Sequence, residues 1–247
     1  MADKFDTVPE EVLKEIYALQ NQQVRLSIRE KARDQFVHHV YDGFIEGRHH
    51  RIIAEKLERV ARGELKRLIV NMPPRHSKSE FASYLMPAWF LGRNPKLKII
   101  QATHNTELAV RFGRKVRDLI DTPDFHTIFP DTGLKADDKA AGRWGTSAGG
   151  EYFAAGVGAA MTGRGADLLI IDDPHSEQDA LSSTAFDHAF EWYTSGPRQR
   201  LQPGGAIIIV MTRWGQKDLT GQVLKMQGSD QMADEWEVVE FPAILPS

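Results

Sequence analysis

The fold of this chain is decided by one stretch, Met72-Pro73-Pro74-Arg75-His76-Ser77-Lys78-Ser79. It follows the apolar run 68–70 and precedes a predicted helix over 80–91. A strand, a tight loop ending in Lys-Ser and a helix are the setting of a phosphate-binding loop, because loop N–H groups and a helix N-terminus attract phosphate. We expect Lys78 to reach the β- and γ-phosphates of a nucleotide and Ser79 to offer its hydroxyl to Mg²⁺.

The stretch departs from the usual pattern, G-x-x-x-x-G-K-[ST]. Pro74, or Pro73 or Met72 if the gap is chosen differently, stands at the first glycine position. Ser77 stands at the second, so it must adopt a backbone conformation that normally suits glycine. A polar surface turn is the alternative interpretation. The candidate nucleotide-binding residues in and beside the loop are Pro74, Arg75, His76, Ser77, Lys78, Ser79 and Glu80.

A second segment, Asp167-Leu168-Leu169-Ile170-Ile171-Asp172-Asp173-Pro174, favours the nucleotide interpretation. Its four consecutive aliphatic residues are typical of a central parallel strand that is covered on both faces. Two carboxylates follow at the carboxyl end, where ligands bind in open α/β sheets. We therefore predict a Walker B element, in which Asp172 holds Mg²⁺ and Asp173 orients or activates the attacking water. The alternative is an acidic strand end that caps the next helix.

Composition sets broad limits on function. The chain of 247 residues has a net charge of −3, so any contact with nucleic acid must be local. It has no cysteine, which excludes disulfides, thiolate metal sites and cysteine nucleophiles. No apolar stretch approaches the roughly 18 residues of a membrane span, and the N-terminus lacks the apolar core of a signal peptide.

Apolar strands alternate with helical patterns along the chain, which favours a mostly parallel sheet wrapped on both faces. We expect residues 121–149 to form an irregular polar loop region. The helical segments are expected at 8–35, 35–41, 49–60, 80–91, 107–120 and 219–226. The further strands are expected at 97–102, 151–155, 206–211 and 236–241.

Nucleotide hydrolysis needs a positive charge near the departing γ-phosphoryl group, often from an arginine. Arg164 is the first candidate, because the glycines on both sides of it allow its loop to move. Arg75 inside the loop and Arg143 beside Trp144 are the alternatives. Most arginines are solvated surface charges, and that interpretation stays open for each of them.

Two further residues are candidates for contacts with the nucleotide. Thr212 ends the apolar run 206–211, where a polar residue can sense the γ-phosphate, although a Thr-capped turn is equally compatible. Gln35 lies ahead of the loop strand, where an adenine pocket is expected. A helix-packing role is an equally good interpretation of that region.

Together these segments resemble the ATPase half of the large terminase subunit, the genome-packaging motor of tailed bacteriophages. The resemblance spans about residues 35–246. It is carried by 71–80, by Leu91-Gly92-Arg93-Asn94-Pro95, by Thr162-Gly163-Arg164-Gly165-Ala166-Asp167, by 170–174 and by Met211-Thr212-Arg213-Trp214.

The resemblance implies a RecA-like P-loop NTPase of the additional-strand, catalytic-glutamate (ASCE) type, with ATP and Mg²⁺ as ligands. It divides the chain into a helical arm at 1–34, an ATPase core at 35–212, and a lid subdomain with the start of a linker at 213–247. It also implies a C-terminal nuclease domain, so we expect the chain to be part of a longer protein. Related motors carry glutamate where this chain has Asp173, and Glu177 is the alternative catalytic carboxylate.

The implied partners are double-stranded DNA, the portal protein, the small terminase subunit and further copies of the chain in a ring, in the cytoplasm of the host cell. Three other classes of protein are alternative interpretations of the sequence. A P-loop small-molecule kinase would leave the Thr-Arg-Trp element unexplained, and a helicase would need a second RecA-like domain. A scaffold that binds nucleotide weakly without hydrolysing it stays possible because of Ser77 and Asp173.

Overall fold

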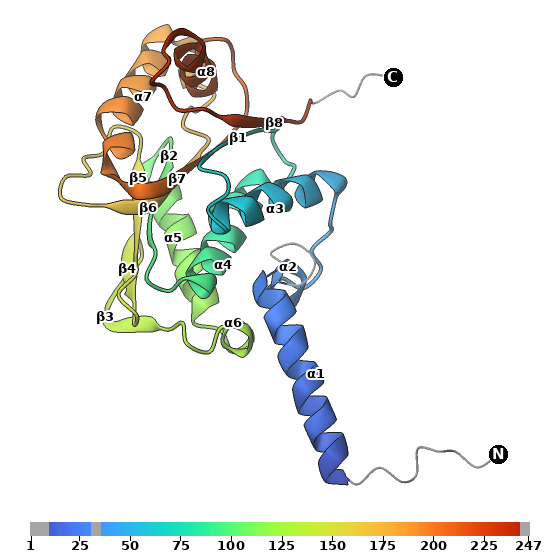
Figure 1. Cartoon of the computed structure of the whole chain (residues 1–247). Helices are drawn as coiled ribbons and strands as arrows, with labels where there is room; N and C mark the ends of the chain where they lie inside the picture. The colour runs from blue at the N-terminus through green and yellow to red at the C-terminus, as the bar shows by residue number, and fades with distance from the viewer. Residues whose placement is uncertain (1–9, 31–35, 243–247) are drawn as a thin grey trace.

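The computed structural model describes residues 10–30 and 36–242 and is built around one eight-stranded sheet (Figure 1). The strand order is β3-β4-β5-β2-β6-β7-β1-β8. All neighbouring strands are parallel except β3 with β4 and β4 with β5, as predicted for a mostly parallel sheet. The strands are β1 (Arg67–Asn71), β2 (Lys98–Thr103), β3 (Leu134–Ala140), β4 (Arg143–Thr146), β5 (Glu151–Gly156), β6 (Ala166–Asp172), β7 (Leu201–Met211) and β8 (Glu237–Glu240).

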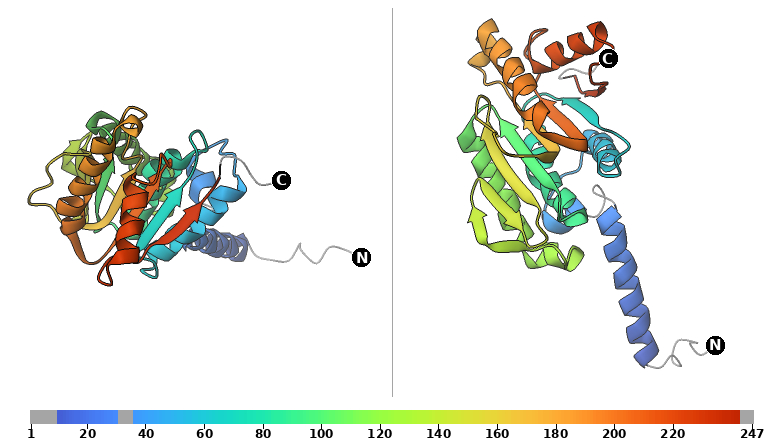
Figure 2. Two further views of the ribbon diagram at one scale, coloured as in Figure 1. Left: turned by 90° about the horizontal axis from the view of Figure 1, so that it is seen from above. Right: turned by 60° about the vertical axis from the view of Figure 1, so that its left-hand side comes forward.

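Helices cover both faces of the sheet (Figure 2). The α-helices are α1 (Glu10–Glu30), α2 (Val37–Val40), α3 (Arg48–Ala61), α4 (Met86–Arg93), α5 (Thr106–Ile120), α6 (Pro123–Ile128), α7 (Ser183–Ser195) and α8 (Leu219–Ser229). The shorter segments are the π-helical turn η2 (Glu80–Leu85) and the 3₁₀ turns η3 (Asp179–Leu181) and η4 (Pro197–Arg200). Among the described residues, no helix is long and apolar enough to cross a membrane.

The aliphatic runs of the central strands supply two separate hydrophobic cores. Successive side chains of a strand point to opposite faces, so Leu168 and Ile170 of β6 pack under α3, α4 and α5, whereas Leu169 and Ile171 pack under α7 and α8. Strands β1 and β7 alternate in the same way. This two-sided burial explains why the runs contain no polar residue until their carboxyl ends.

The topology brings the two predicted motifs to one edge of the sheet. Strand β7 lies between β1 and β6, and the register pairs Asn71 with Met211 and Asp172 with Val210. The segments that follow β1, β6 and β7 therefore emerge side by side at the carboxyl edge. The order places β7 between β1, the strand before the loop, and β6, the strand that ends in Asp172.

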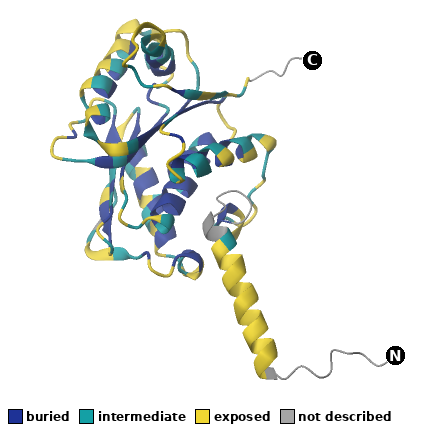
Figure 3. Ribbon diagram, viewed as in Figure 1, coloured by how far each residue is buried: buried dark blue, intermediate teal, exposed yellow. Residues whose placement is uncertain are grey.

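Three regions differ from the expectations or extend them. Residues 121–149, expected to be irregular, contain α6 and the antiparallel pair β3 and β4. In residues 213–242, expected to contain a lid subdomain, α8 packs into the second core and β8 pairs with β1 in the main sheet. Helix α1 forms an arm that projects from the body with an exposed surface (Figure 3), as expected for the N-terminal segment.

Candidate active site

The loop between β1 and η2 has the backbone conformation that the motif requires. Arg75 and Ser77 have φ values of 63° and 60°, in the left-handed region that favours glycine. The backbone N–H of Phe81 donates to the Ser77 carbonyl at 2.9 Å, so the helix begins directly from the loop. Ser77 thus adopts the conformation expected at the second glycine position of the pattern, in spite of its side chain.

Lys78 lies against the second carboxylate of the Walker B segment. Its side chain is 8% exposed, and its Nζ lies 2.7 Å from Oδ2 of Asp173. The other carboxylate oxygen of Asp173 accepts a hydrogen bond of 2.8 Å from the backbone N–H of Thr212. Asp173 itself has a φ of 42°, so its backbone is strained at the point where three segments meet. The segments that follow β1, β6 and β7 are therefore joined through one carboxylate.

Asp172 points to the other side of the strand end and is held by two hydroxyl groups. Ser79 Oγ donates to Oδ1 at 3.1 Å, and Ser83 Oγ donates to Oδ2 at 2.6 Å. Asp172 is 1% exposed. Burial raises the pKa of its carboxyl group to about 7, and the charge of Asp173 acts in the same direction. A positive ion beside this carboxylate would remove much of that penalty.

The oxygen atoms of Ser79 and Asp172 fit a magnesium ion by their chemistry. Mg²⁺ prefers hydroxyl, carboxylate and water oxygens and is commonly bound through only one or two protein ligands together with phosphate. Among the described residues, the buried carboxylate of Asp172 accepts hydrogen bonds from two serine hydroxyls, whereas Lys78 is paired with Asp173. These residues could therefore hold the metal of a nucleotide complex.

An open cavity of about 720 Å³ is lined by Lys78 and Asp173. It brings together five of the predicted residues, and exposed Glu177 is one of them. The described residues that line it are Pro74, Lys78, His104, Asn105, Asp173, His175, Ser176, Glu177, Gln178, Asp179, Thr212 and Trp214. Its size and polar lining suit a phosphate-bearing ligand with water.

Other predicted residues of the loop lie outside this cavity lining. Arg75 and His76 are exposed, and Nδ1 of His76 bonds to the Pro74 carbonyl at 2.8 Å. Glu80 turns toward α5, where it accepts from Lys115 Nζ at 2.7 Å. Gln35 lies outside the described residues. Its neighbour Phe36 is fully buried against Phe125 and Phe129, which is a packing role.

Arg164 is remote from Lys78 within this chain. Its Nη1 donates to Glu151 Oε1 at 2.7 Å, and its guanidinium lies 3.9 Å from the ring centroid of Phe153. Glu151 begins β5, so the pair lies at the amino end of the parallel strands, opposite the phosphate loop. Arg143, the alternative, approaches the same carboxylate at 3.6 Å. The geometry therefore does not bring Arg164 to the loop of its own chain, and a role in the site of a neighbouring subunit stays a prediction.

Several residues that sequence reasoning missed complete the site. Asp218 is fully buried and accepts from Arg213 Nε at 2.9 Å and from the backbone N–H of Trp214. Asp218 also caps α8, so Arg213 has a structural partner beside the cavity. His175, directly after the Walker B segment, accepts from the backbone N–H of Leu219 at 2.9 Å, and burial lowers its pKa.

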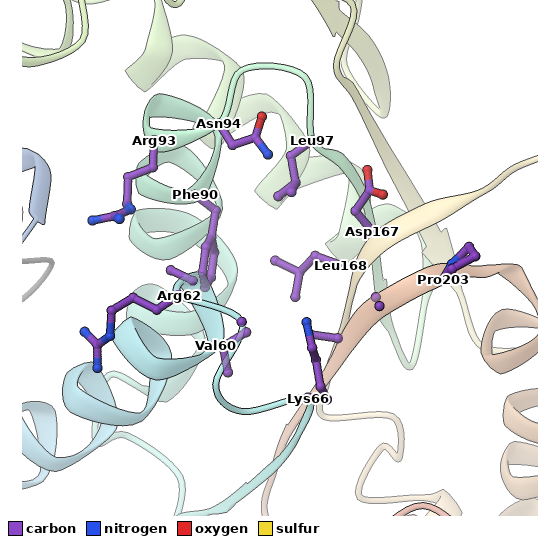
Figure 4. A pocket seen from close by; sticks show the side chains of 15 residues that line it. Val60, Arg62, Lys66, Phe90, Arg93, Asn94, Leu97, Asp167, Leu168 and Pro203 are labelled. Carbon is purple, nitrogen blue, oxygen red and sulfur yellow. The ribbon is translucent and has the colours of Figure 1, made fainter.

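A second pocket, of about 270 Å³, lies at the opposite edge of the sheet (Figure 4). Val60, Phe90, Leu97 and Leu168 give it an apolar floor, with Lys66 and Asp167 at its rim (Figure 4). None of the candidate nucleotide-binding residues among the described part of the chain lines it. The candidate nucleotide site is therefore assigned from the chemistry of the two carboxylates and Lys78. It is not assigned from how enclosed a pocket is.

The chain has a terminase-like α/β fold, with the 72–79 loop and the paired carboxylates of Asp172 and Asp173 at the carboxyl edge of its sheet. The chain is similar in structure to the large terminase of bacteriophage HK97, with a TM-score of 0.52 and 12% sequence identity. The match covers 85% of this chain and 42% of the terminase chain. No protein-family model and no curated protein matches the sequence. At this identity the similarity is one of fold.

Proposed function

We propose that this chain is the ATP-hydrolysing motor domain of a viral DNA-packaging terminase, which couples hydrolysis to translocation of double-stranded DNA into a procapsid. One observation carries the proposal: Lys78 and Ser79 of the loop contact Asp173 and Asp172 of a strand distant in sequence. ATP hydrolysis requires a phosphate cradle and metal-binding and water-orienting carboxylates at one place. The terminase-like fold supports the assignment to a packaging motor.

The contacts suggest how the residues divide the work. Lys78 would exchange Asp173 for the β- and γ-phosphates when ATP binds. Oδ2 of Asp173 would then accept a hydrogen bond from the attacking water, while Oδ1 stays on the N–H of Thr212. Ser79 and Asp172 would hold Mg²⁺, which neutralises charge on the phosphate oxygens. Thr212 would sense the loss of the γ-phosphate through its hydrogen bond to the carboxylate of Asp173.

The remaining parts of the proposal concern assembly. Arg164 would enter the site of a neighbouring copy in a ring, after leaving Glu151. The ring would act on the portal protein, with DNA delivered by the small terminase subunit, in the cytoplasm of the host cell. The match covers less than half of the HK97 terminase chain, so a nuclease domain elsewhere in a longer protein belongs to the same proposal.

A scaffold that binds nucleotide without hydrolysing it is the second candidate, because both oxygens of Asp173 are already engaged. A small-molecule kinase is the third. Phosphate release by the full-length protein, with and without double-stranded DNA and portal, separates the three. A motor should release phosphate faster with DNA. Nucleotide binding without release would favour the scaffold, and phosphoryl transfer to a small acceptor, independent of DNA, would favour the kinase.

A further inference from the structure

Ser83 is a polar residue in an apolar segment. It lies in the π-helical turn η2, is fully buried, and has Phe81, Ala82 and Leu85 as buried neighbours in the first core. A hydroxyl group in such surroundings must find a partner, because leaving it unpaired costs about 1–3 kcal/mol. Its partner is Oδ2 of Asp172 at 2.6 Å. That distance is typical of a hydroxyl that donates to an ionised carboxylate.

The two serines hold the two oxygens of one carboxylate. Ser79 and Ser83 are four residues apart, so their side chains share one face of the helical segment that follows the loop. Ser79 donates to Oδ1 and Ser83 to Oδ2. With Oδ2 engaged from inside the core, the carboxylate cannot rotate freely, and Oδ1 stays on the side of the phosphate loop.

The π-helical turn determines the position of the Ser83 side chain. The backbone N–H of Met86 bonds to the carbonyl of Phe81, five residues earlier, so the turn is wider than an α-helical one. Phe81 and Leu85 are anchored in the core at 1% and 0% exposure. Ser83, between them, is therefore held against the strand end of β6 and not toward solvent. Such single wide turns are frequent at functional sites.

We propose that Ser83 is a positioning residue for the metal of the nucleotide site, acting through Asp172. The inference rests on the proposed function, since it assigns Asp172 to Mg²⁺. Groups that hydrogen-bond a metal-ligating carboxylate fix its orientation, and their removal commonly lowers metal affinity about 10- to 100-fold. Ser83 makes no contact with the cavity beside Lys78, so it should affect the metal and not the phosphates directly.

The test compares nucleotide binding with and without Mg²⁺, by calorimetry with a non-hydrolysable ATP analogue. Ser83→Ala should weaken Mg²⁺-dependent binding about tenfold and leave binding in EDTA unchanged. Ser83→Thr keeps the donor and should restore wild-type behaviour, and Ser83→Cys, a weak donor of similar size, should fall between. Thr146→Val is the matched control, because it removes a buried hydroxyl that bonds to Pro95 and Gly150 at the other end of the sheet.

If Ser83→Ala weakens nucleotide binding equally with and without Mg²⁺, the inference is overturned in favour of a packing role. A loss of Mg²⁺-dependent binding in Thr146→Val as large as that in Ser83→Ala would also overturn it. So would wild-type Mg²⁺ dependence in both Ser83→Ala and Ser83→Cys. If Ser83→Ala does not fold, the comparison between Ser83→Thr and Ser83→Cys decides the question in the same way. A wild-type chain that binds no nucleotide at all would instead overturn the proposed function, and this inference with it.

Discussion

Lys78 Nζ lies 2.7 Å from Oδ2 of Asp173, so the loop lysine and the second carboxylate of the strand end are paired with each other. The lysine is nearly buried and the carboxylate is one quarter exposed. In the proposed function, phosphate binding would break this ion pair and free both groups for their proposed roles. The chain thus holds the loop cation and the strand-end carboxylate in direct contact with each other.

Asp173→Asn should separate binding from hydrolysis. The amide cannot neutralise Lys78, so ATP affinity should stay the same or rise, while turnover should fall at least 100-fold because the water loses its carboxylate. Equilibrium binding and single-turnover phosphate release measure the two effects. Glu177→Gln is the comparison, since Glu177 lines the same cavity but is exposed. If Glu177→Gln loses turnover and Asp173→Asn keeps it, Glu177 is the catalytic carboxylate.

Ser77→Gly should be tolerated, and Ser77→Val should not. Ser77 has a φ of 60°, where a residue with a Cβ is strained by roughly 1–2 kcal/mol and a β-branched one by more. Glycine removes that strain but loses more entropy on folding, so the two effects nearly cancel. Thermal unfolding and nucleotide affinity should both be close to wild type in Ser77→Gly and lower in Ser77→Val. Equal behaviour of the two variants would contradict a left-handed backbone at this position.

Arg164→Ala should lower turnover without weakening the fold. Its ion pair with Glu151 is partly exposed and contributes no more than about 1 kcal/mol. A finger acting between subunits is worth about 10³–10⁵ in rate in related hydrolases. A mixture of Arg164→Ala with Lys78→Ala protein should regain activity, because each subunit supplies what the other lacks.

Arg143→Ala is the control for that experiment, because Arg143 approaches the same carboxylate from β4. It should leave turnover unchanged. If no mixture of Arg164→Ala and Lys78→Ala exceeds the separate variants while wild type is active, Arg164 is not a finger. Arg75, exposed in the loop itself, then becomes the better candidate, or Arg143 if Arg143→Ala is the variant that loses turnover.

Acid should destabilise the chain through His50. Burial lowers its pKa from 6.5 to about 4, and the neighbouring imidazole of His49 lowers the pKa further. Glu46 raises the pKa, whereas His76 raises it through a hydrogen bond and lowers it through its charge. Between these pH values the unfolded chain binds more protons, so the stabilisation is present above pH 6.5 and is lost as the pH falls toward 4. His50→Gln should lose less stability over this range, by about 2 kcal/mol.

Chemical denaturation at pH 7 and pH 4.5 measures the difference. His39→Gln, at an exposed position, should keep the wild-type dependence on pH. Parallel loss of stability in wild type and His50→Gln would show that His50 titrates normally.

The central sheet can be predicted from the sequence because several of its strands contain uninterrupted apolar runs. The run 168–171 is apolar on both faces, and the polar residues that follow it can only lie at a strand end. Strand β3 gives no such signal, since its Leu-Lys-Ala-Asp-Asp-Lys-Ala sequence is a polar edge strand with an irregular register. Helix α7 was missed because its aromatic residues do not form a simple apolar stripe.

Residues of the candidate site can be predicted where the chemistry follows from local sequence, but not where contacts depend on the packing of distant segments. Lys78, Ser79 and Asp172 lie in motifs whose spacing carries the prediction. The pairing of Arg164 with Glu151 depends on the register of β5 beside β2, which one sequence does not specify. Ser83 could have been noticed, because a serine four residues after Ser79 shares its helix face.

The most direct test of the central claim is ATP binding and phosphate release by Lys78→Ala, measured beside Lys66→Ala. Both variants lose one lysine, but Lys66 is exposed at the opposite edge of the sheet. Lys78→Ala should lose measurable ATP binding or hydrolysis, because among the described residues Lys78 is the only lysine or arginine that lines the cavity. Lys66→Ala should match wild type. Unchanged affinity and turnover in Lys78→Ala would contradict the assignment of the loop as the nucleotide site.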